Sequence, residues 1–308
     1  MSPLAERIDP NAYSTPFLAT RTLHRDPYPA ISPSNPANSQ KDRIIIITGA
    51  SAGIGKAFWA RAGAKGIVIA ARRQDLLDNV AEGLRAISPS TTVLAVKTDI
   101  VNESEIEDLF AQVQKTFGRA ADVLLNNAAY LKDVPIISPS ADEWWKGVEI
   151  NVKGTYLMSR RFILSQPNPA ESTATIITVS SGRAGFTTDR GSAYNISKLA
   201  EQRLNEHIQL EHPKLRVFTT IPGIVRTDMP SEPFIPYAKD HVDLTGMLAL
   251  YLAQPRADFL RGGMISVNWD VDELEQHKDE IVEKKVLQTS WLPILPFCGG
   301  KGLGAHKQ

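Results

Sequence analysis

A tyrosine and a lysine four residues apart, Tyr194 and Lys198, have the types and the spacing for proton-transfer chemistry. Residues four apart lie on one face of an α-helix, one turn from each other. The pKa of a free phenol is about 10, and a nearby ammonium group favours the phenolate. The pair therefore indicates a tyrosine that can exchange a proton with a substrate oxygen. Two solvated side chains on a helix surface would show the same spacing, so the rest of the chain has to decide.

A glycine-rich turn follows the first strongly apolar run of the chain. Residues 44–47 are four isoleucines, which is typical of a strand buried on both faces. The sequence TGASAGIG at 48–55 comes next, and a helical pattern starts at Lys56. Glycines permit a tight turn and a close approach of backbone to phosphate, and a helix N-terminus attracts an anion. This order predicts a dinucleotide phosphate site.

Two arginines follow the second expected strand, at 67–70. Ala71 is followed by Arg72 and Arg73, and the first acidic residue is Asp75. In dinucleotide folds an acidic residue near this point holds the ribose 2′-hydroxyl, whereas an arginine accommodates a 2′-phosphate. The sequence therefore favours NADP(H) as the cofactor, over the alternative that both arginines are only the solvated start of the next helix.

Strand-like runs alternate with helical patterns along the rest of the chain. Further strands are expected at 92–97, 122–125, 175–179, 216–220 and 264–267. Helices are expected at 102–117, at 141–165, around Tyr194 and at 244–253. This alternation predicts an α/β fold with a doubly wound parallel sheet of the Rossmann type.

The residues with unusual chemistry share one position in this pattern, the carboxyl end of a strand. They are the glycine turn, Arg72, Asp99, Asn126, Ser181 and Pro222. Sheets of this class bind their ligands at that edge. We therefore expect one ligand site there, although asparagines at strand ends can also serve only the local backbone.

The expected helix at 141–165 carries a polar residue in an apolar setting. Asn151 lies between Ile150 and Val152, with Gly154 close by. This pattern indicates a local distortion of the helix with an internal role for the amide, and an ordinary exposed position stays open as the alternative. The helix around Tyr194 has an apolar stripe that is expected to be its buried face, at Ile196, Leu199, Leu204 and Ile208.

Composition narrows the classes of function. The chain has 308 residues, of which 43% are hydrophobic, and equal numbers of basic and acidic residues, 34 each. A balanced charge gives no reason to expect nucleic acid or an anionic membrane surface as a partner. Cys298 is alone and the histidines are scattered, so neither an internal disulfide nor a metal site is expected. No apolar run approaches membrane-spanning length, and we expect a cytoplasmic protein.

Two segments of different composition flank the alternating region, which gives three parts: 1–40, 41–270 and 271–308. Residues 1–40 are rich in proline and serine, and they are either a disordered leader or a segment that lies along the folded surface. Residues 226–243 look like a mobile, proline-broken loop near the ligand. Residues 271–287 read as one charged, mostly solvated helix, and 291–297 as an apolar segment stiffened by proline.

Taken together, these motifs resemble the short-chain dehydrogenase/reductase family. The resemblance covers residues 41–270 in order and rests on the glycine turn, Asn126-Asn127-Ala128-Ala129, Asn151, Ser181, the Tyr194/Lys198 pair and Pro222-Gly223. The sequences at 28–33 and 266–270 resemble a fungal subgroup of the family whose members are often tied to secondary metabolism.

The resemblance implies a role for each of four residues. Tyr194 is implied as the general acid in carbonyl reduction and as the base in alcohol oxidation. Lys198 is implied to hold the nicotinamide ribose, Ser181 to hydrogen-bond the reacting oxygen, and Asn151 to anchor a water in the proton relay. Donors aimed at an oxygen that gains negative charge stabilise the transition state, which agrees with these roles.

The resemblance also implies the residues that bind the cofactor NADP(H). They are Gly49, Ser51, Gly53, Ile54, Gly55, Arg72, Asp99, Ile100, Asn127, Tyr194, Lys198, Pro222, Gly223, Ile224 and Thr227. Two features depart from the family pattern: Ala129 stands where glycine is usual, and Asn268-Trp269-Asp270 replaces Asp-Gly-Gly. The first puts the fit of the cofactor in question, and the second marks 271–308 as an addition.

The expected function is NADP(H)-dependent reduction of a carbonyl, or oxidation of a secondary alcohol, on a small to medium organic molecule. Two alternatives stay open at this point. The same fold and cofactor can serve isomerisation, dehydration or cyclisation, and the chain can be a non-catalytic NADP(H) sensor. The resemblance further implies a homodimer or homotetramer through the helices at 141–165 and 193–211.

Overall fold

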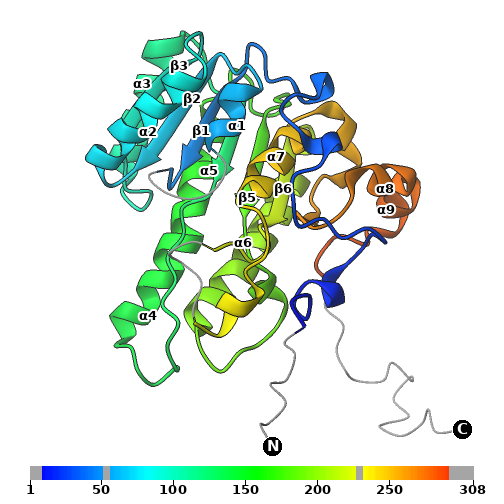
Figure 1. Cartoon of the computed structure of the whole chain (residues 1–308). Coiled ribbons are helices and arrows are strands. Elements are labelled where there is room, and N and C mark those ends of the chain that lie inside the picture. The colour runs from blue at the N-terminus through cyan, green and yellow to red at the C-terminus, as the bar shows by residue number, and fades with distance from the viewer. Residues whose placement is uncertain (1–8, 51–55, 227–231, 291–308) are drawn as a thin grey trace, which may run out of the picture.

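Seven parallel strands form one central sheet (Figure 1), in the order β3-β2-β1-β4-β5-β6-β7. The structure, a computed structural model, describes residues 9–50, 56–226 and 232–290. The strands are β1 (Ile44–Thr48), β2 (Gly66–Ala71), β3 (Thr92–Lys97), β4 (Val123–Asn126), β5 (Thr175–Val179), β6 (Arg216–Ile221) and β7 (Met264–Ser266). The strand order reverses between β1 and β4, which is where such sheets open a ligand crevice. The expected Rossmann-type fold is confirmed.

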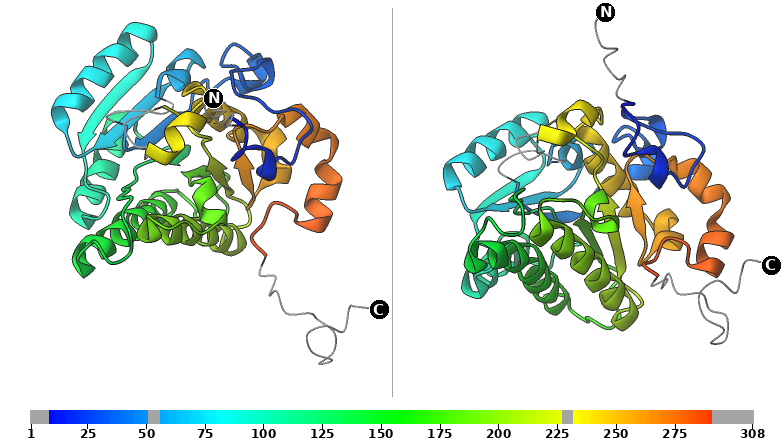
Figure 2. Two further views of the ribbon diagram at one scale, coloured as in Figure 1. Left: turned by 60° about the horizontal axis from the view of Figure 1, so that its bottom comes forward. Right: turned by 90° about the horizontal axis from the view of Figure 1, so that it is seen from below.

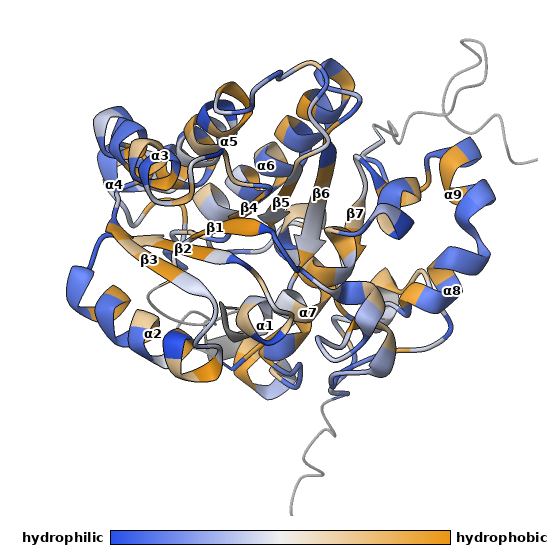
Figure 3. Ribbon diagram, turned by 90° about the horizontal axis from the view of Figure 1, so that it is seen from above, coloured by the Kyte–Doolittle hydropathy of each residue, from blue (hydrophilic) through white to orange (hydrophobic). Residues whose placement is uncertain are grey.

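Helices cover both faces of the sheet (Figure 3). One layer contains α1 (Lys56–Arg61), α2 (Gln74–Ile87) and α7 (Asp243–Leu252), and the other contains α3 (Glu103–Phe117), α5 (Gly154–Leu164) and α6 (Ser192–Glu211). The isoleucines of β1 alternate between the layers, with Ile45 and Ile47 in the first core and Ile44 and Ile46 in the second. A strand between two helical layers has no solvent face, which explains its unbroken apolar run.

The expected distortion around Asn151 is confirmed as a π-helical turn. The helix α4 (Ala141–Val148) passes into the π-turn η4 (Glu149–Lys153), and α5 continues from Gly154. A side chain at Gly154 would place its Cβ 2.6 Å from Cδ1 of Ile100, so the glycine makes room for the residue after β3. The extra residue in the turn lets the buried Asn151 face inward.

The described part of the leader, residues 9–40, lies along the folded surface beside the C-terminal helices (Figure 2). It forms three 3₁₀ turns, η1 (Thr15–Phe17), η2 (Pro29–Ile31) and η3 (Pro36–Asn38), each with proline in its first positions. Ile31 is fully buried, and the Tyr28 hydroxyl donates to the carbonyl of Trp269 at 3.0 Å. For these residues the disordered alternative is wrong, because apolar side chains and backbone groups both find partners.

Two expectations about local structure need correction. The segment 271–287 is not one helix but two, α8 (Val271–Gln276) and α9 (Lys278–Lys284), and its apolar positions Val271, Leu274 and Ile281 are buried. On α6, Ile196 and Leu199 are exposed, because the buried face of that helix carries Tyr194, Lys198 and other polar groups instead. The described end of the loop at 226–243 contains a 3₁₀ turn, η6 (Glu232–Tyr237). The segment 291–297 lies outside the described residues.

No helix in the described ranges is long and apolar enough to cross a membrane.

Candidate active site

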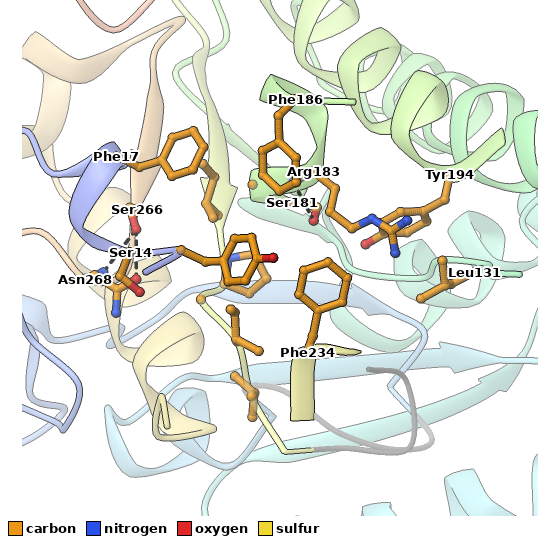
Figure 4. A pocket seen from close by; sticks show the side chains of 17 residues that line it. Ser14, Phe17, Leu131, Ser181, Arg183, Phe186, Tyr194, Phe234, Ser266 and Asn268 are labelled. Atoms are coloured by element: carbon orange, nitrogen blue, oxygen red, sulfur yellow. Dashed lines mark hydrogen bonds between the residues drawn. The ribbon is translucent and has the colours of Figure 1, made fainter. Parts of the chain in front are cut away.

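Ser181 and Tyr194 line the same cavity of about 160 Å³ at the carboxyl edge of the sheet (Figure 4). Ser181 is the second residue after β5 and caps the 3₁₀ turn η5 (Gly182–Gly185), where its Oγ accepts from the Arg183 N–H at 3.2 Å. Tyr194 is on the first turn of α6 and is only 8% exposed. The two hydroxyl groups that the sequence singled out are therefore brought together in one pocket.

Lys198 lies one helical turn from Tyr194, with its Nζ 5.7 Å from the centre of the tyrosine ring. The ammonium is buried and donates to the Val179 carbonyl at 2.9 Å and to the Glu201 carboxylate at 2.9 and 3.1 Å. The sequence analysis did not single out Glu201. Its position three residues after Lys198 was the available signal, since that spacing shares a helix face.

Glu201 is a buried acid with two hydrogen-bonding neighbours. Burial raises the pKa of Glu201 to about 7, and the charge of Lys198 together with hydrogen bonds from Lys198 and Thr155 partly offset that rise. The carboxylate therefore changes its charge near neutral pH, next to the lysine that adjoins the candidate general acid.

Asn151 links the π-turn to two segments of the site. Its Oδ1 accepts from the Tyr130 N–H at 2.7 Å, and its Nδ2 donates to the Tyr130 carbonyl at 3.0 Å and to Ser197 Oγ at 2.8 Å. Ser197 in turn donates to the carbonyl of Tyr194. The buried amide thus fixes the strand β4 exit against the first turn of α6, where Tyr194 lies.

The glycine at the start of the expected phosphate turn is sterically required. Gly49 has φ of 65°, and a Cβ on it would come within 2.6 Å of the Ala128 Cα. Asn127 supports this close approach, because its Nδ2 donates to the Thr48 carbonyl at 3.0 Å. Gly49 and Asn127 therefore meet at the switch point between β1 and β4. Five other expected cofactor ligands lie outside the described residues: Ser51, Gly53, Ile54, Gly55 and Thr227.

Arg72 and Asp99 leave the sheet at neighbouring strand ends. Arg72 is exposed directly after β2, and the Thr98 N–H donates to the Ala71 carbonyl at 2.9 Å, which brings the two strand ends together. Asp99 is half-buried, and the next residue, Ile100, is buried against Gly154. These three residues surround the edge where the adenosine half of a dinucleotide is expected.

The strand exit at Pro222-Gly223-Ile224 is fixed by a buried carboxylate, Asp240. The Ile224 N–H donates to Asp240 Oδ2 at 2.6 Å, and Gly223, at φ of 72°, has no room for a Cβ beside the same group. Arg25 of the leader and Asn268 donate to Asp240 Oδ1 at 3.0 and 2.7 Å. Burial raises the pKa of Asp240, against the opposing effect of these donors.

The unusual ending Asn268-Trp269-Asp270 is explained by the leader. Asn268 also donates to the His24 carbonyl at 2.8 Å, the Trp269 indole donates to the Phe17 carbonyl at 2.7 Å, and Asp270 pairs with His24 at 2.7 Å. Each replaced residue therefore holds the leader in place, and the leader brings Tyr13, Ser14 and Phe17 to the pocket. These three pocket residues and Arg183 were not predicted from the sequence.

A family model described as short chain dehydrogenase matches residues 43–234. The chain belongs to this family. A short chain dehydrogenase of Monascus purpureus, mpl6, is 34% identical over 282 residues, which are 88% of this chain and 95% of that protein. The short chain dehydrogenase andI of Emericella variicolor is 32% identical over 284 residues, with the same two shares covered. The resemblance to a fungal group within the family is thereby confirmed.

Solved structures of the family agree with the fold. A short-chain type dehydrogenase/reductase from Mycobacterium ulcerans superimposes with a TM-score of 0.67 at 25% identity, over 74% of this chain and 89% of that one. One from Mycobacterium marinum gives 0.68 at 24% identity, over 75% and 96%, and supports the fold alone.

Members of the short chain dehydrogenase family are oxidoreductases whose Rossmann-type fold binds a nicotinamide dinucleotide. The described residues fit such a ligand. Gly49 lets the turn after β1 pass close against the Ala128 backbone, at the switch point beside Asn127 where the phosphates of such a ligand are expected. The pocket with Ser181 and Tyr194 adjoins the Pro222-Gly223-Ile224 segment, where the nicotinamide end is expected.

Proposed function

We propose that this short-chain dehydrogenase is an NADP(H)-dependent enzyme that reduces a carbonyl, or oxidises a secondary alcohol, of a small to medium organic metabolite. One observation carries the proposal. Tyr194 and Ser181 line one pocket, and the ammonium of Lys198 lies 5.7 Å from the Tyr194 ring. A phenol and a hydroxyl in one cavity, with a buried ammonium next to the phenol, are the groups that carbonyl reduction needs.

In this proposal the bound nicotinamide supplies the hydride that the carbonyl carbon accepts. Negative charge then develops on the carbonyl oxygen, and Tyr194 donates its hydroxyl proton to that oxygen. Ser181 donates a hydrogen bond to the same oxygen and orients it. Lys198 adds positive charge beside the phenol, and Asn151 holds the Tyr194 turn in register with the exit of β4. In alcohol oxidation the same tyrosine accepts the proton.

The cofactor is proposed to be held along the carboxyl edge of β1 to β6. Gly49 and Asn127 support its phosphates and central part, Asp99 and Ile100 its adenine, and Pro222, Gly223 and Ile224 its nicotinamide. Arg72, exposed after β2, favours a 2′-phosphate and therefore NADP(H).

The test is the loss of reduced-nicotinamide absorbance with NADPH and with NADH across a panel of aliphatic and aryl ketones. We expect carbonyl-dependent consumption with at least tenfold higher kcat/KM for NADPH. A clear preference for NADH would contradict the role of Arg72. A product formed without net consumption of NADPH would contradict the redox chemistry.

The assembly is proposed to be a homodimer or homotetramer through α4, α5 and α6. These helices carry large apolar side chains on the surface, with Trp145 60%, Ile196 54% and Leu210 78% exposed. An apolar surface of this kind is typical of an interface between subunits. Light scattering after gel filtration should give a multiple of the 33.8 kDa chain mass, and Ile196→Glu should lower it.

The cellular setting is proposed from the same relatives. We propose a cytoplasmic enzyme of fungal secondary metabolism; the relatives from Monascus and Emericella, which match 88% of this chain, support the metabolic part of the proposal.

A further inference from the structure

Four aromatic rings stand around the pocket in front of Tyr194 (Figure 4). Tyr13 and Phe17 come from the leader, Phe186 follows η5, and Phe234 is in η6. The Tyr13 ring lies 5.2 Å from Phe234 and 6.2 Å from Phe186, and Phe17 lies 5.9 Å from Phe186. We call these four residues the aromatic wall. Their planes are inclined by 25° to 59° to one another, so a flat ligand ring can stack on one ring and meet a neighbouring one at its edge.

Arg183 is the charged residue of this pocket, and no other charged side chain is found among the described residues that line it. It is 8% exposed, and its guanidinium carbon lies 5.7 Å from the Tyr194 ring and 5.4 Å from the Phe234 ring. The guanidinium is therefore held between the candidate general acid and one ring of the aromatic wall.

The hydrogen bonds of Arg183 leave one edge of the guanidinium without an acceptor. Its Nη2 donates to Asp133 at 2.9 Å, to Thr188 Oγ1 at 3.1 Å and to the Arg190 carbonyl at 2.9 Å. Its Nε is buried and has no acceptor within the described ranges. A buried N–H without an acceptor costs free energy. Because Nε is closed off from solvent, a ligand oxygen reaches it only when the side chain turns toward the pocket, and that contact would remove the cost.

The ion pair of Arg183 with Asp133 indicates the charge of the ligand oxygen that the pocket can accept. Asp133 already pairs with Arg183, with both side chains about one-tenth exposed, so the pocket does not need a full negative charge. A neutral or polarised acceptor such as a phenol or enol oxygen is sufficient. The aromatic wall favours a ligand in which this acceptor oxygen is attached to a flat, conjugated ring system.

From these observations, and resting on the proposed carbonyl chemistry at Tyr194, we infer the substrate class. The substrate is a planar aromatic ketone with a second oxygen acceptor close to the reacting carbonyl. Its rings stack on the aromatic wall, and the second oxygen accepts from Arg183 while the carbonyl faces Tyr194 and Ser181. Arg183 and the leader thereby determine specificity.

Three bicyclic ketones test the inference: 8-hydroxy-1-tetralone, 1-tetralone and the saturated 1-decalone. Their affinities are measured by calorimetric titration into the full-length protein saturated with NADP⁺. We expect 8-hydroxy-1-tetralone to bind about tenfold more tightly than 1-tetralone, and 1-tetralone severalfold more tightly than 1-decalone. Equal affinities within each pair, or no binding of any of the three, would overturn the inference.

Variants assign the two preferences to residues. In Arg183→Met, 8-hydroxy-1-tetralone and 1-tetralone should bind with about equal affinity. In Phe234→Leu, the affinity ratio of 1-tetralone to 1-decalone should be smaller than in the wild type. Arg85→Met on α2, which does not line the pocket, should keep both ratios. The wild-type comparison needs no variant to fold.

Turnover of the same ketones separates the two proposals. Binding that discriminates without turnover contradicts only the proposed function, and turnover without discrimination contradicts only the substrate class.

Discussion

Lys198 and Glu201 form an ion pair that is closed off from solvent. The Nζ to Oε2 distance is 2.9 Å, and the side chains are 2% and 1% exposed. The lysine also donates to the Val179 carbonyl, so a backbone group and a carboxylate both hold it. A negative charge at this place weakens the positive field that Lys198 exerts on the phenol of Tyr194. The pair therefore links the charge of Glu201 to the proton on the tyrosine.

The first prediction concerns the pH profile of Glu201→Gln. The groups that act on Glu201 are Lys198 and the hydroxyl of Thr155, and burial raises its pKa to about 7. Above that pH the wild-type carboxylate offsets the lysine charge and helps Tyr194 to keep its proton for carbonyl reduction. Without the carboxylate the tyrosinate is favoured, so the alkaline limb of kcat/KM for reduction should move to lower pH by about one unit.

The matched control is Glu206→Gln, which removes a carboxylate from the same helix, where it pairs with Arg203. This variant should keep the wild-type profile. Identical profiles for Glu201→Gln and the wild type would show that the ion pair has no influence on the proton transfer.

The second prediction concerns Asn151→Leu. The change removes three hydrogen bonds and leaves the backbone of Tyr130 and the hydroxyl of Ser197 without them. The free energy of unfolding should fall by about 2–4 kcal/mol. The kcat should fall more than tenfold with little change in KM, because the turn that carries Tyr194 loses its support.

Asn205→Leu provides the comparison for this loss. Asn205 is equally buried on α6 and bonds to Phe218 and Thr219, away from the pocket. In denaturant titration the free energy of unfolding of Asn205→Leu should fall by a similar amount, while the folded variant keeps the wild-type kcat. If Asn151→Leu also kept its kcat, the amide would be structural only.

The third prediction concerns Gly49→Ala. The new Cβ would meet the Ala128 backbone at 2.6 Å in a left-handed conformation, so the turn has to move. NADPH affinity, measured by fluorescence titration, should fall at least tenfold. Gly63→Ala has a similar φ of 79° but open space around the new methyl, and it should keep its affinity. Equal behaviour of the two variants would mean that the close approach at Gly49 does not shape the cofactor site.

The fourth prediction concerns Arg72→Asp. The exposed guanidinium after β2 is proposed to pair with a 2′-phosphate, and an aspartate there would repel that group and accept from a ribose hydroxyl instead. The kcat/KM for NADPH should fall tenfold or more, while that for NADH stays level or rises. Equal losses with both cofactors would place Arg72 outside the phosphate site.

Local patterns were enough to predict the sheet and the turn at Asn151. A run of β-branched residues such as Ile44–Thr48 is typical of a strand between two layers, and a polar residue at 151 with a following glycine indicated the helix distortion. The place of Ser181 at the ligand edge followed from parallel topology, whereas its convergence with Tyr194 was implied by the family resemblance.

Contacts between distant segments were not readable from local patterns. The Tyr28 hydroxyl bonds to Trp269, 241 residues away, and neither residue shows in its own surroundings that it has this partner. The same holds for Arg183, whose place between Tyr194 and Phe234 depends on how three loops meet. The prediction that Ile196 and Leu199 lie on the buried face of α6 was wrong, because that face carries polar side chains and these two apolar side chains lie on the surface.

The most direct test of the proposed chemistry is a single-turnover measurement with Tyr194→Phe. Enzyme, NADPH and a ketone that the wild type accepts are mixed, and the reduced-nicotinamide absorbance is followed while NADPH binding is measured separately. We expect NADPH affinity to stay within about threefold of wild type while the rate of absorbance loss falls by at least a hundredfold. A Tyr194→Phe enzyme that binds NADPH and consumes it with ketone at the wild-type rate would contradict the account.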